Sequence, residues 1–379
     1  MSKLAMRRAW FQVHKWLGLT LAILIIPISL TGAALVWDEA LARVVTPQRF
    51  AVSGDAVLAP GAYVAAANRV FKRGERPAML TMPEGDGPVV LSGSPALASK
   101  RPGPPERTMV YLDPPTARVL DVASSSSGVL RTFHMLHGSL LIPGVGRTIV
   151  GWIGVAMMMS AFTGLWLWWP TVGRWARGLR WRRHRNTDTN LHYLLGFWIA
   201  LPLFVLSLTG AWISFPAFFA GLTGGAAQQR GPDRAALARA RTLANPAQSL
   251  DRAVAQAGAA KDIGGRGDVR SIAWPTDLKP EWTIGYAAGD GPLRYVRVTD
   301  ADGQATAVPP RATGGAAPLM RRVHDGTGTG IVWQTIIFLG GLLPAILAVT
   351  GIVMWWRARG WKAELAARRD GNRGAVPAE

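Results

Sequence analysis

Histidine is the residue type in this chain whose number and spacing point to redox or metal chemistry. The sequence contains no cysteine, which excludes disulfides, iron–sulfur clusters, thiolate-ligated haem and covalent c-type haem attachment. Any such chemistry must therefore use other ligands. The six histidines are His14, His134, His137, His184, His192 and His324.

Four of these histidines stand at equivalent positions in two halves of the chain. In each half, one histidine lies 17 residues before a Thr-Gly pair and a second lies 26 residues before another. The 17-residue spacing joins His14 to Thr31 and His192 to Thr209, and the 26-residue spacing joins His137 to Thr163 and His324 to Thr350. The repeated spacing predicts a tandem duplication. We interpret the Thr-Gly pairs themselves as helix-packing sites.

Paired histidines suit a b-type haem, because neutral imidazole binds iron well and two axial imidazoles per iron are a standard arrangement. Gly18 and Gly196 each follow one of the histidines by four residues, on the same helix face, where a missing side chain leaves room for a flat porphyrin. His134 lies three residues before His137 and is an alternative ligand, gate or substrate contact. The alternative is that duplication copied ordinary interfacial histidines. His184 is expected to be solvated.

The elements that must position these histidines are apolar spans. The chain has 379 residues, of which 49% are apolar and 17% charged, too apolar for an ordinary soluble globule. Four stretches are long enough to cross about 30 Å of hydrocarbon at about 1.5 Å per residue, and tryptophan lies near most of their ends. They are 16–37, 148–170, 191–220 and 331–356.

The basic residues predict how these spans are oriented. The net charge is +19, but lysine and arginine concentrate in 1–15, 171–190 and 357–379, which flank the spans. This distribution follows the positive-inside rule and argues against nucleic acid as a partner. We therefore expect a multi-pass protein surrounded by lipid in a bacterial inner membrane, with an N-terminus, a basic loop and a C-terminal tail in the cytoplasm. Residues 38–147 and 221–330 then lie outside.

Each outer segment is large enough for a small folded module. Pro60–Phe71 and Ser249–Ala257 are predicted helices, and hairpin signals follow each of them near Tyr111 and Arg294. The predicted fold is an α-helical membrane protein with four transmembrane helices in two tandem-repeat halves, each with a small periplasmic α+β module.

Common enzyme motifs give no catalytic residue. We find no P-loop, no G-x-S-x-G, no H-E-x-x-H and no dinucleotide fingerprint in the sequence. An electron-transfer protein of this sequence would therefore depend on a separate electron donor, such as a quinol or a cytoplasmic reductase.

Several motifs resemble one known family. His14-Lys-Trp-Leu-Gly-Leu, Leu-Thr-Gly-Ala, Gly144-Val-Gly-Arg147 and Thr-Gly-Leu-Trp-Leu-Trp-Trp-Pro170 are similar to the PepSY-associated transmembrane helix family. The resemblance covers nearly the whole chain and implies that the outer modules are PepSY domains. In length and four-span layout the chain is most similar to the inner-membrane ferric-siderophore reductase branch. That branch implies two b-type haems and reduction of ferric siderophores in the periplasm.

The resemblance implies that His14, His192, His137 and His324 are the axial haem ligands. The topology pairs His14 with His192 near the cytoplasmic face and His137 with His324 near the outer face. Arg131 and Arg321 lie near the outer histidines and are expected either to pair with haem propionates or an anionic chelate, or to be plain interfacial arginines.

Two other functions compete with the reductase. One is a non-catalytic PepSY membrane protein that binds peptide or regulates a protease, whose histidines would be dispensable. The other is a siderophore or iron permease component. Four spans without a charged intramembrane residue argue against a polar pathway through one protomer.

Overall fold

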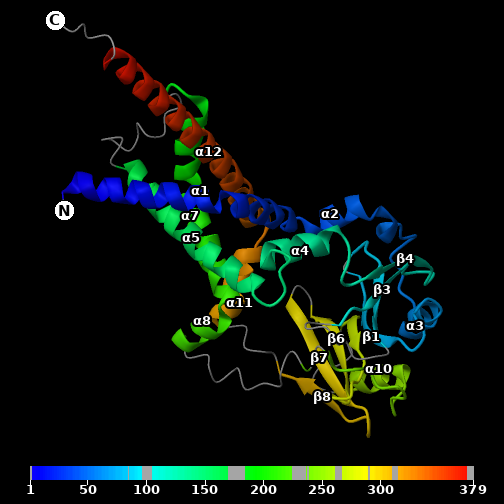
Figure 1. Ribbon diagram of the computed structural model, residues 1–379. Coiled ribbons are helices and arrows are strands. Elements are labelled where there is room, and N and C mark those ends of the chain that lie inside the picture. The colour runs from blue at the N-terminus through cyan, green and yellow to red at the C-terminus, as the bar shows by residue number, and fades with distance from the viewer. Residues whose placement is uncertain are drawn as a thin grey trace, which may run out of the picture. The chain divides into compact units, whose positions relative to one another are not determined.

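A computed structural model (Figure 1) describes residues 2–83, 85–95, 105–169, 184–223, 236, 239–260, 267–288, 291–309 and 315–373. The chain folds into two compact units. The helical unit comprises Met1–Asp38, Thr132–Ala226 and Gly314–Glu379, and the sheet unit comprises Glu39–Arg131 and Ala227–Thr313. Most of the predicted basic loop, 171–183, lies outside the described residues.

Four long helices form the helical unit, and all four are long and apolar enough to cross a membrane. They are α1 (Lys3–Leu35), α5 (Gly146–Trp168), α7 (Thr187–Ser214) and α12 (Ile331–Arg373). This confirms the four predicted spans. The helices α1 and α12 also run well beyond the predicted limits, because hydropathy marks where a helix leaves hydrocarbon and not where its hydrogen bonds end. Ser2 caps α1, and its hydroxyl accepts a hydrogen bond from the Ala5 amide at 3.2 Å.

The four helices pack in a closed ring: α1 against α5, α5 against α7, α7 against α12, and α12 against α1. In this ring α1 and α7 lie diagonally opposite. Glycines let the neighbours approach closely. A Cβ added to Gly341 of α12 would lie 2.8 Å from the amide nitrogen of Ala33, and one added to Gly154 of α5 would lie 3.2 Å from the carbonyl oxygen of Ser207.

Two short helices each precede a spanning helix. Helix α4 (Val129–Ser139) turns into α5 through Leu140 and Leu141, whose φ angles are 52° and 60°. Helix α11 (Ala316–Asp325) ends at Gly326, whose φ is 77° and whose amide donates to the carbonyl of Arg322. Left-handed residues end a helix abruptly, so each short helix is set at an angle to the spanning helix that follows it.

The sheet unit contains one eight-stranded antiparallel sheet in the order β4-β3-β2-β1-β5-β6-β7-β8. The strands are β1 (Arg76–Thr81), β2 (Val89–Ser94), β3 (Thr108–Leu112), β4 (Val119–Ser124), β5 (Val269–Ala273), β6 (Glu281–Ala288), β7 (Gly291–Thr299) and β8 (Ala305–Val308). The two predicted outer modules are therefore not separate. Strand β1 pairs with β5, with Leu80 opposite Ile272, and so neither strand is left with an unpaired edge.

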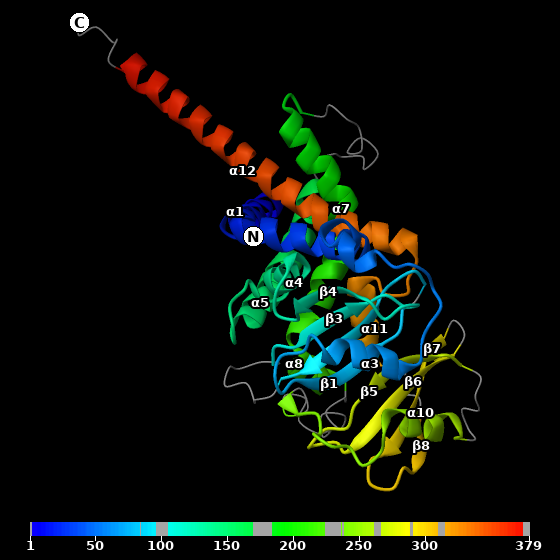
Figure 2. The same ribbon diagram turned by 90° about the vertical axis from the view of Figure 1, so that its right-hand side faces the viewer.

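Helices α3 (Pro60–Asn68) and α10 (Leu250–Gly258) cover one face of this sheet (Figure 2). Both helices and both hairpins, β3–β4 and β7–β8, were predicted and are confirmed. The core lies between the helices and this face, and its largest fully buried side chains include Trp282, Tyr63 and Leu80.

A buried aspartate begins each of the two confirmed hairpin turns. Asp113 accepts hydrogen bonds from the Ser53 amide at 2.7 Å, from the Ser53 hydroxyl at 2.6 Å and from the Thr116 hydroxyl. Asp300 accepts from the amides of Ala247 at 2.9 Å and Gln248 at 3.1 Å. Burial raises the pKa of Asp113, but these hydrogen bonds outweigh it and hold the pKa below its ordinary value of 3.8.

Candidate functional site

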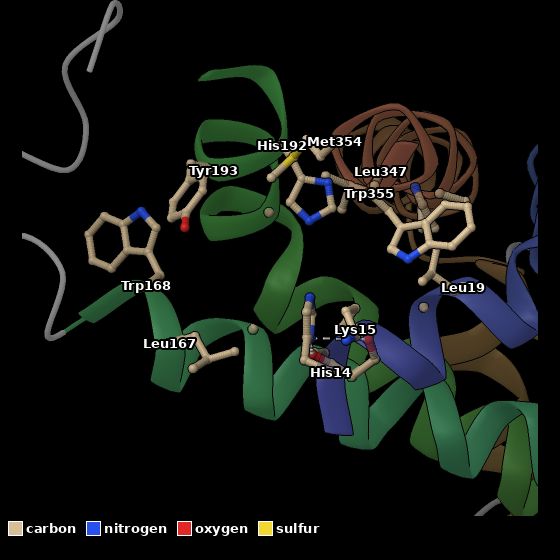
Figure 3. A pocket seen from close by; sticks show the side chains of 18 of the residues that line it. His14, Lys15, Leu19, Leu167, Trp168, His192, Tyr193, Leu347, Met354 and Trp355 are labelled. Atoms are coloured by element: carbon tan, nitrogen blue, oxygen red, sulfur yellow. Dashed lines mark hydrogen bonds between the residues drawn. The ribbon is translucent and has the colours of Figure 1, made fainter. Parts of the chain in front are cut away.

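The first histidine pair, His14 and His192, faces itself across the ring of spanning helices. His14 is on α1 and His192 is on α7, the two helices that lie diagonally opposite. Their ring centres are 6.4 Å apart and their ring planes are inclined at 82°. Figure 3 shows the two rings approaching one opening from opposite sides.

A cavity of about 630 Å³ surrounds the first pair, within the size range of pockets that hold cofactors. Gly18 and Gly196 both line it. A Cβ added to Gly18 would meet nothing within 4 Å, and one added to Gly196 would meet only Leu347 Cδ2 at 3.9 Å. The space beside these glycines is thus open, as a flat ligand lying against the helices would require.

Aromatic and basic side chains complete the wall of this cavity. Trp168, Tyr193 and Trp355 supply flat apolar surface, and Lys15 and Arg359 supply positive charge. A planar ligand with acidic substituents matches this combination. Sequence reasoning used Lys15 and Arg359 only as signs of topology, although the position of Lys15 directly after His14 was a signal for the site.

The second histidine pair, His137 and His324, has ring centres 6.0 Å apart and ring planes inclined at 37°. His137 is on α4 and His324 is on α11, the short helices that precede α5 and α12. Burial lowers the pKa of His137, and burial together with the neighbouring His137 lowers the pKa of His324 to about 4. Both rings are therefore neutral at pH 7, the form in which imidazole binds a metal.

Every ring of the two pairs is hydrogen-bonded through Nδ1. The partners are the Ser160 carbonyl at 3.1 Å for His14, the Ile28 carbonyl at 2.8 Å for His137, the Thr350 hydroxyl at 3.0 Å for His192 and the Leu206 carbonyl at 3.1 Å for His324. A carbonyl oxygen only accepts, so in a neutral ring Nδ1 carries the proton and the Nε2 lone pair is available. The geometry thus prepares Nε2 as the ligand atom.

The two pairs lie at separate levels along the same helices. On α1, His14 of the first pair is 14 residues before Ile28, which holds the second pair, and on α7 the same interval separates His192 from Leu206. At a rise of about 1.5 Å per residue, the levels are about 21 Å apart along the helix axis.

Both pairs fit haem iron. An imidazole nitrogen lies about 2 Å from the metal it binds, so two imidazoles on opposite sides of one ion have ring centres roughly 6 Å apart. Among the described residues, no group of three or more His, Cys, Asp or Glu could hold a bare metal ion. Two imidazoles alone leave the remaining coordination positions to a planar ligand such as a porphyrin.

The other predicted site residues lie outside the pairs. The structure places His137, and not the exposed His134, opposite His324. Arg131 and Arg321 are exposed, and their pairing with an anion remains a prediction. His184 was predicted to be solvated, which is wrong: its ring is half-buried with its centre 4.7 Å from that of Tyr193.

Comparison with known proteins gives one family. The family model described as the PepSY-associated TM region matches residues 11–358, nearly the whole chain and all four spanning helices. No curated protein matches the chain.

Proposed function

Since the chain belongs to the PepSY-associated TM family, we propose that it is a b-type dihaem electron-transfer protein that reduces ferric siderophores on the periplasmic side of the bacterial inner membrane. The observation that carries the proposal is the presence of two facing imidazole pairs, at 6.4 and 6.0 Å, in a unit of four spanning helices. Idle interfacial histidines would have no reason to face one another twice.

In this proposal, His14 and His192 hold the inner haem, and His137 and His324 hold the outer haem. Bound haem iron supplies one-electron chemistry by alternating between Fe³⁺ and Fe²⁺. The chain's own part is to orient the imidazoles through Nδ1, to surround the inner site with apolar side chains, and to neutralise acidic substituents with Lys15 and Arg359.

The electron balance requires a donor, which we propose to be a membrane quinol or a cytoplasmic reductase. Each ferric ion takes up one electron, so one quinol reduces two ferric siderophores and releases two protons as it becomes quinone. Oxygen-rich siderophores bind Fe²⁺ far less tightly than Fe³⁺, so reduction releases the iron. The separation of about 21 Å between the histidine levels covers most of a hydrocarbon core of about 30 Å.

The charges at the helix ends support a cytoplasmic location of both termini. Arg7, Arg8 and Lys15 lie in the first half of α1, and Arg357 and Arg359 follow the apolar part of α12. Arg357 also forms an ion pair with Asp188 at the start of α7. By the positive-inside rule, these ends face the cytoplasm. The second histidine pair then lies toward the periplasm.

Haem content tests the proposal. The protein, purified in detergent after expression with ample haem, is assayed by its oxidised and dithionite-reduced visible spectra and a pyridine haemochrome count. We expect a sharp b-type α-band and two haems per chain, one haem in His324→Ala, and two in the matched control His134→Ala. A colourless wild-type protein, or an unchanged count in His324→Ala, would overturn the proposal and favour the regulatory PepSY protein.

A further inference from the structure

Each histidine ring of the two pairs lies on a Thr-Gly pair of a neighbouring spanning helix. Glycine, threonine and the carbonyl three residues before the threonine surround the ring together, and we call this group a Thr-Gly seat. The seats are Thr163-Gly164 for His14, Thr350-Gly351 for His192, Thr31-Gly32 for His137 and Thr209-Gly210 for His324. The earlier interpretation of these pairs as helix-packing sites misses this contact.

The glycine of each seat provides the space that the ring occupies. A Cβ added there would approach the Cε1 atom of the histidine to 2.6 Å at Gly32, 3.0 Å at Gly164, 3.1 Å at Gly210 and 3.5 Å at Gly351. The first three distances are shorter than an ordinary van der Waals contact between carbon atoms, and the fourth is within the usual range. Alanine should therefore displace the ring at three seats and be tolerated at the fourth.

The threonine of each seat is committed as a hydrogen-bond acceptor toward the ring. Its single hydroxyl proton is donated to the carbonyl four residues earlier: from Thr31 to Pro27 at 2.6 Å, from Thr163 to Met159 at 2.8 Å, from Thr209 to Val205 at 2.9 Å and from Thr350 to Ile346 at 2.9 Å. What remains on the oxygen is lone pairs, which can only accept. Such a hydroxyl stabilises a ring with its proton on Nδ1.

The seats are not identical in this hydroxyl contact. The hydroxyls of Thr163, Thr350 and Thr209 lie 3.1, 3.0 and 3.0 Å from Nδ1 of their histidines. For His137, among the described contacts, the Nδ1 partner is the Ile28 carbonyl at 2.8 Å and not Thr31. Thr31 is therefore a matched control for the hydroxyl contact.

We propose that the Thr-Gly seats are positioning sites that fix the tautomer and placement of all four histidines, so that each Nε2 faces the partner ring. The role of Nε2 as a haem ligand rests on the proposed function, whereas the seat itself does not. The seats also tune the bound group, because a hydrogen bond from Nδ1 strengthens the ring as an electron donor through Nε2.

The glycine series tests placement at the inner site. Gly164→Ala and Gly351→Ala are compared there, because both seats serve the first pair at different distances. We expect Gly164→Ala to lose one of the two haems and Gly351→Ala to keep both, with both variants folded by circular dichroism. Equal haem content in these two variants would overturn the placement role of the glycine.

The threonine series tests tuning at the outer site. Thr209→Val removes the hydroxyl but keeps the shape of the side chain, and Thr31→Val is its control. We expect a more positive midpoint potential for the outer haem in Thr209→Val, restoration by Thr209→Ser, and no shift in Thr31→Val. An unchanged potential in Thr209→Val would overturn the tuning role.

A failure of the proposed function is distinguishable from a failure of the seats. If the wild-type protein is colourless, the tautomer is read directly from ¹⁵N NMR of histidine-labelled full-length protein in lipid. The seats predict the proton on Nδ1 in the four paired rings, and a movement of the His324 proton toward Nε2 in Thr209→Val. Wild-type paired rings protonated on Nε2 would overturn the proposal, whatever the haem content.

Discussion

At the scale of single residues, the atom bonded to Nδ1 determines what each histidine can do. A neutral ring has one proton, and a carbonyl or committed hydroxyl at Nδ1 leaves the lone pair on Nε2. The repeated spacing predicts which four histidines matter, and topology predicts how they pair. It does not predict Ile28 or Leu206 as partners, because these residues act through their backbone and any side chain supplies the same carbonyl.

Lys15 gives a residue-scale prediction for the first site. Lys15 lines the cavity around His14, whereas Arg8 is exposed and is not among the residues lining it. In Lys15→Met we expect the inner haem to transfer to an excess of apomyoglobin several-fold faster, because an acidic substituent loses its charge partner, an interaction of about 1.5–3 kcal/mol. Arg8→Met should transfer haem at the wild-type rate. Indistinguishable rates in the two variants would exclude Lys15 as an anchor.

Asp113 gives a second prediction, on pH. Its pKa in the folded protein lies below the ordinary 3.8, so the carboxylate adds stability above pH 3.8 that is lost as the pH falls through the folded value. We expect Asp113→Asn to melt below the wild type at pH 7, and the difference to shrink below pH 3.8. Thermal melts of the full-length protein between pH 7 and 3 measure this. A constant difference across the range would contradict the prediction.

At the scale of elements, local patterns predict helices and hairpins but not the strand pairing that joins them. Apolar length predicts α1, α5, α7 and α12, and turn residues predict β3–β4 and β7–β8. The pairing of β1 with β5 joins residues about 190 apart in the sequence. No turn specifies this register, which depends on which apolar faces fit together under α3 and α10.

Strand β1 offers a matched pair of substitutions for this junction. Leu80 is fully buried in the core, whereas the neighbouring Met79 points to the other face and is 44% exposed. We expect Leu80→Ala to destabilise the sheet unit by about 2–5 kcal/mol, because it opens a cavity. Met79→Ala should cost less than about 0.5 kcal/mol, as surface changes usually do.

Pulse proteolysis of the full-length protein across a urea series compares the two variants. Cleavage within the sheet unit should begin at a much lower urea concentration in Leu80→Ala than in Met79→Ala. Equal midpoints would show that the junction does not contribute to the core.

At the scale of the whole molecule, the absence of cysteine makes the proposed orientation easy to test. Single substitutions Ser2→Cys, before α1, and Ser126→Cys, in the turn after β4, place one exposed thiol in each unit. In intact spheroplasts we expect a membrane-impermeant maleimide to label Ser126→Cys at once and Ser2→Cys only after lysis. The reverse pattern would invert the topology and with it the assignment of inner and outer sites.

The pairing of β1 with β5 also determines when the protein can finish folding. Strand β1 leaves the ribosome about 190 residues before β5, and the spanning helices α5 and α7 lie between them. At about 5–20 residues per second, β1 waits roughly 10–40 s with one edge unpaired. During biogenesis, the first half of the sheet is thus an intermediate open to proteases and to wrong strand partners until α7 has been inserted. The quality of the sheet is therefore controlled by the rate of helix insertion as well as by its own core.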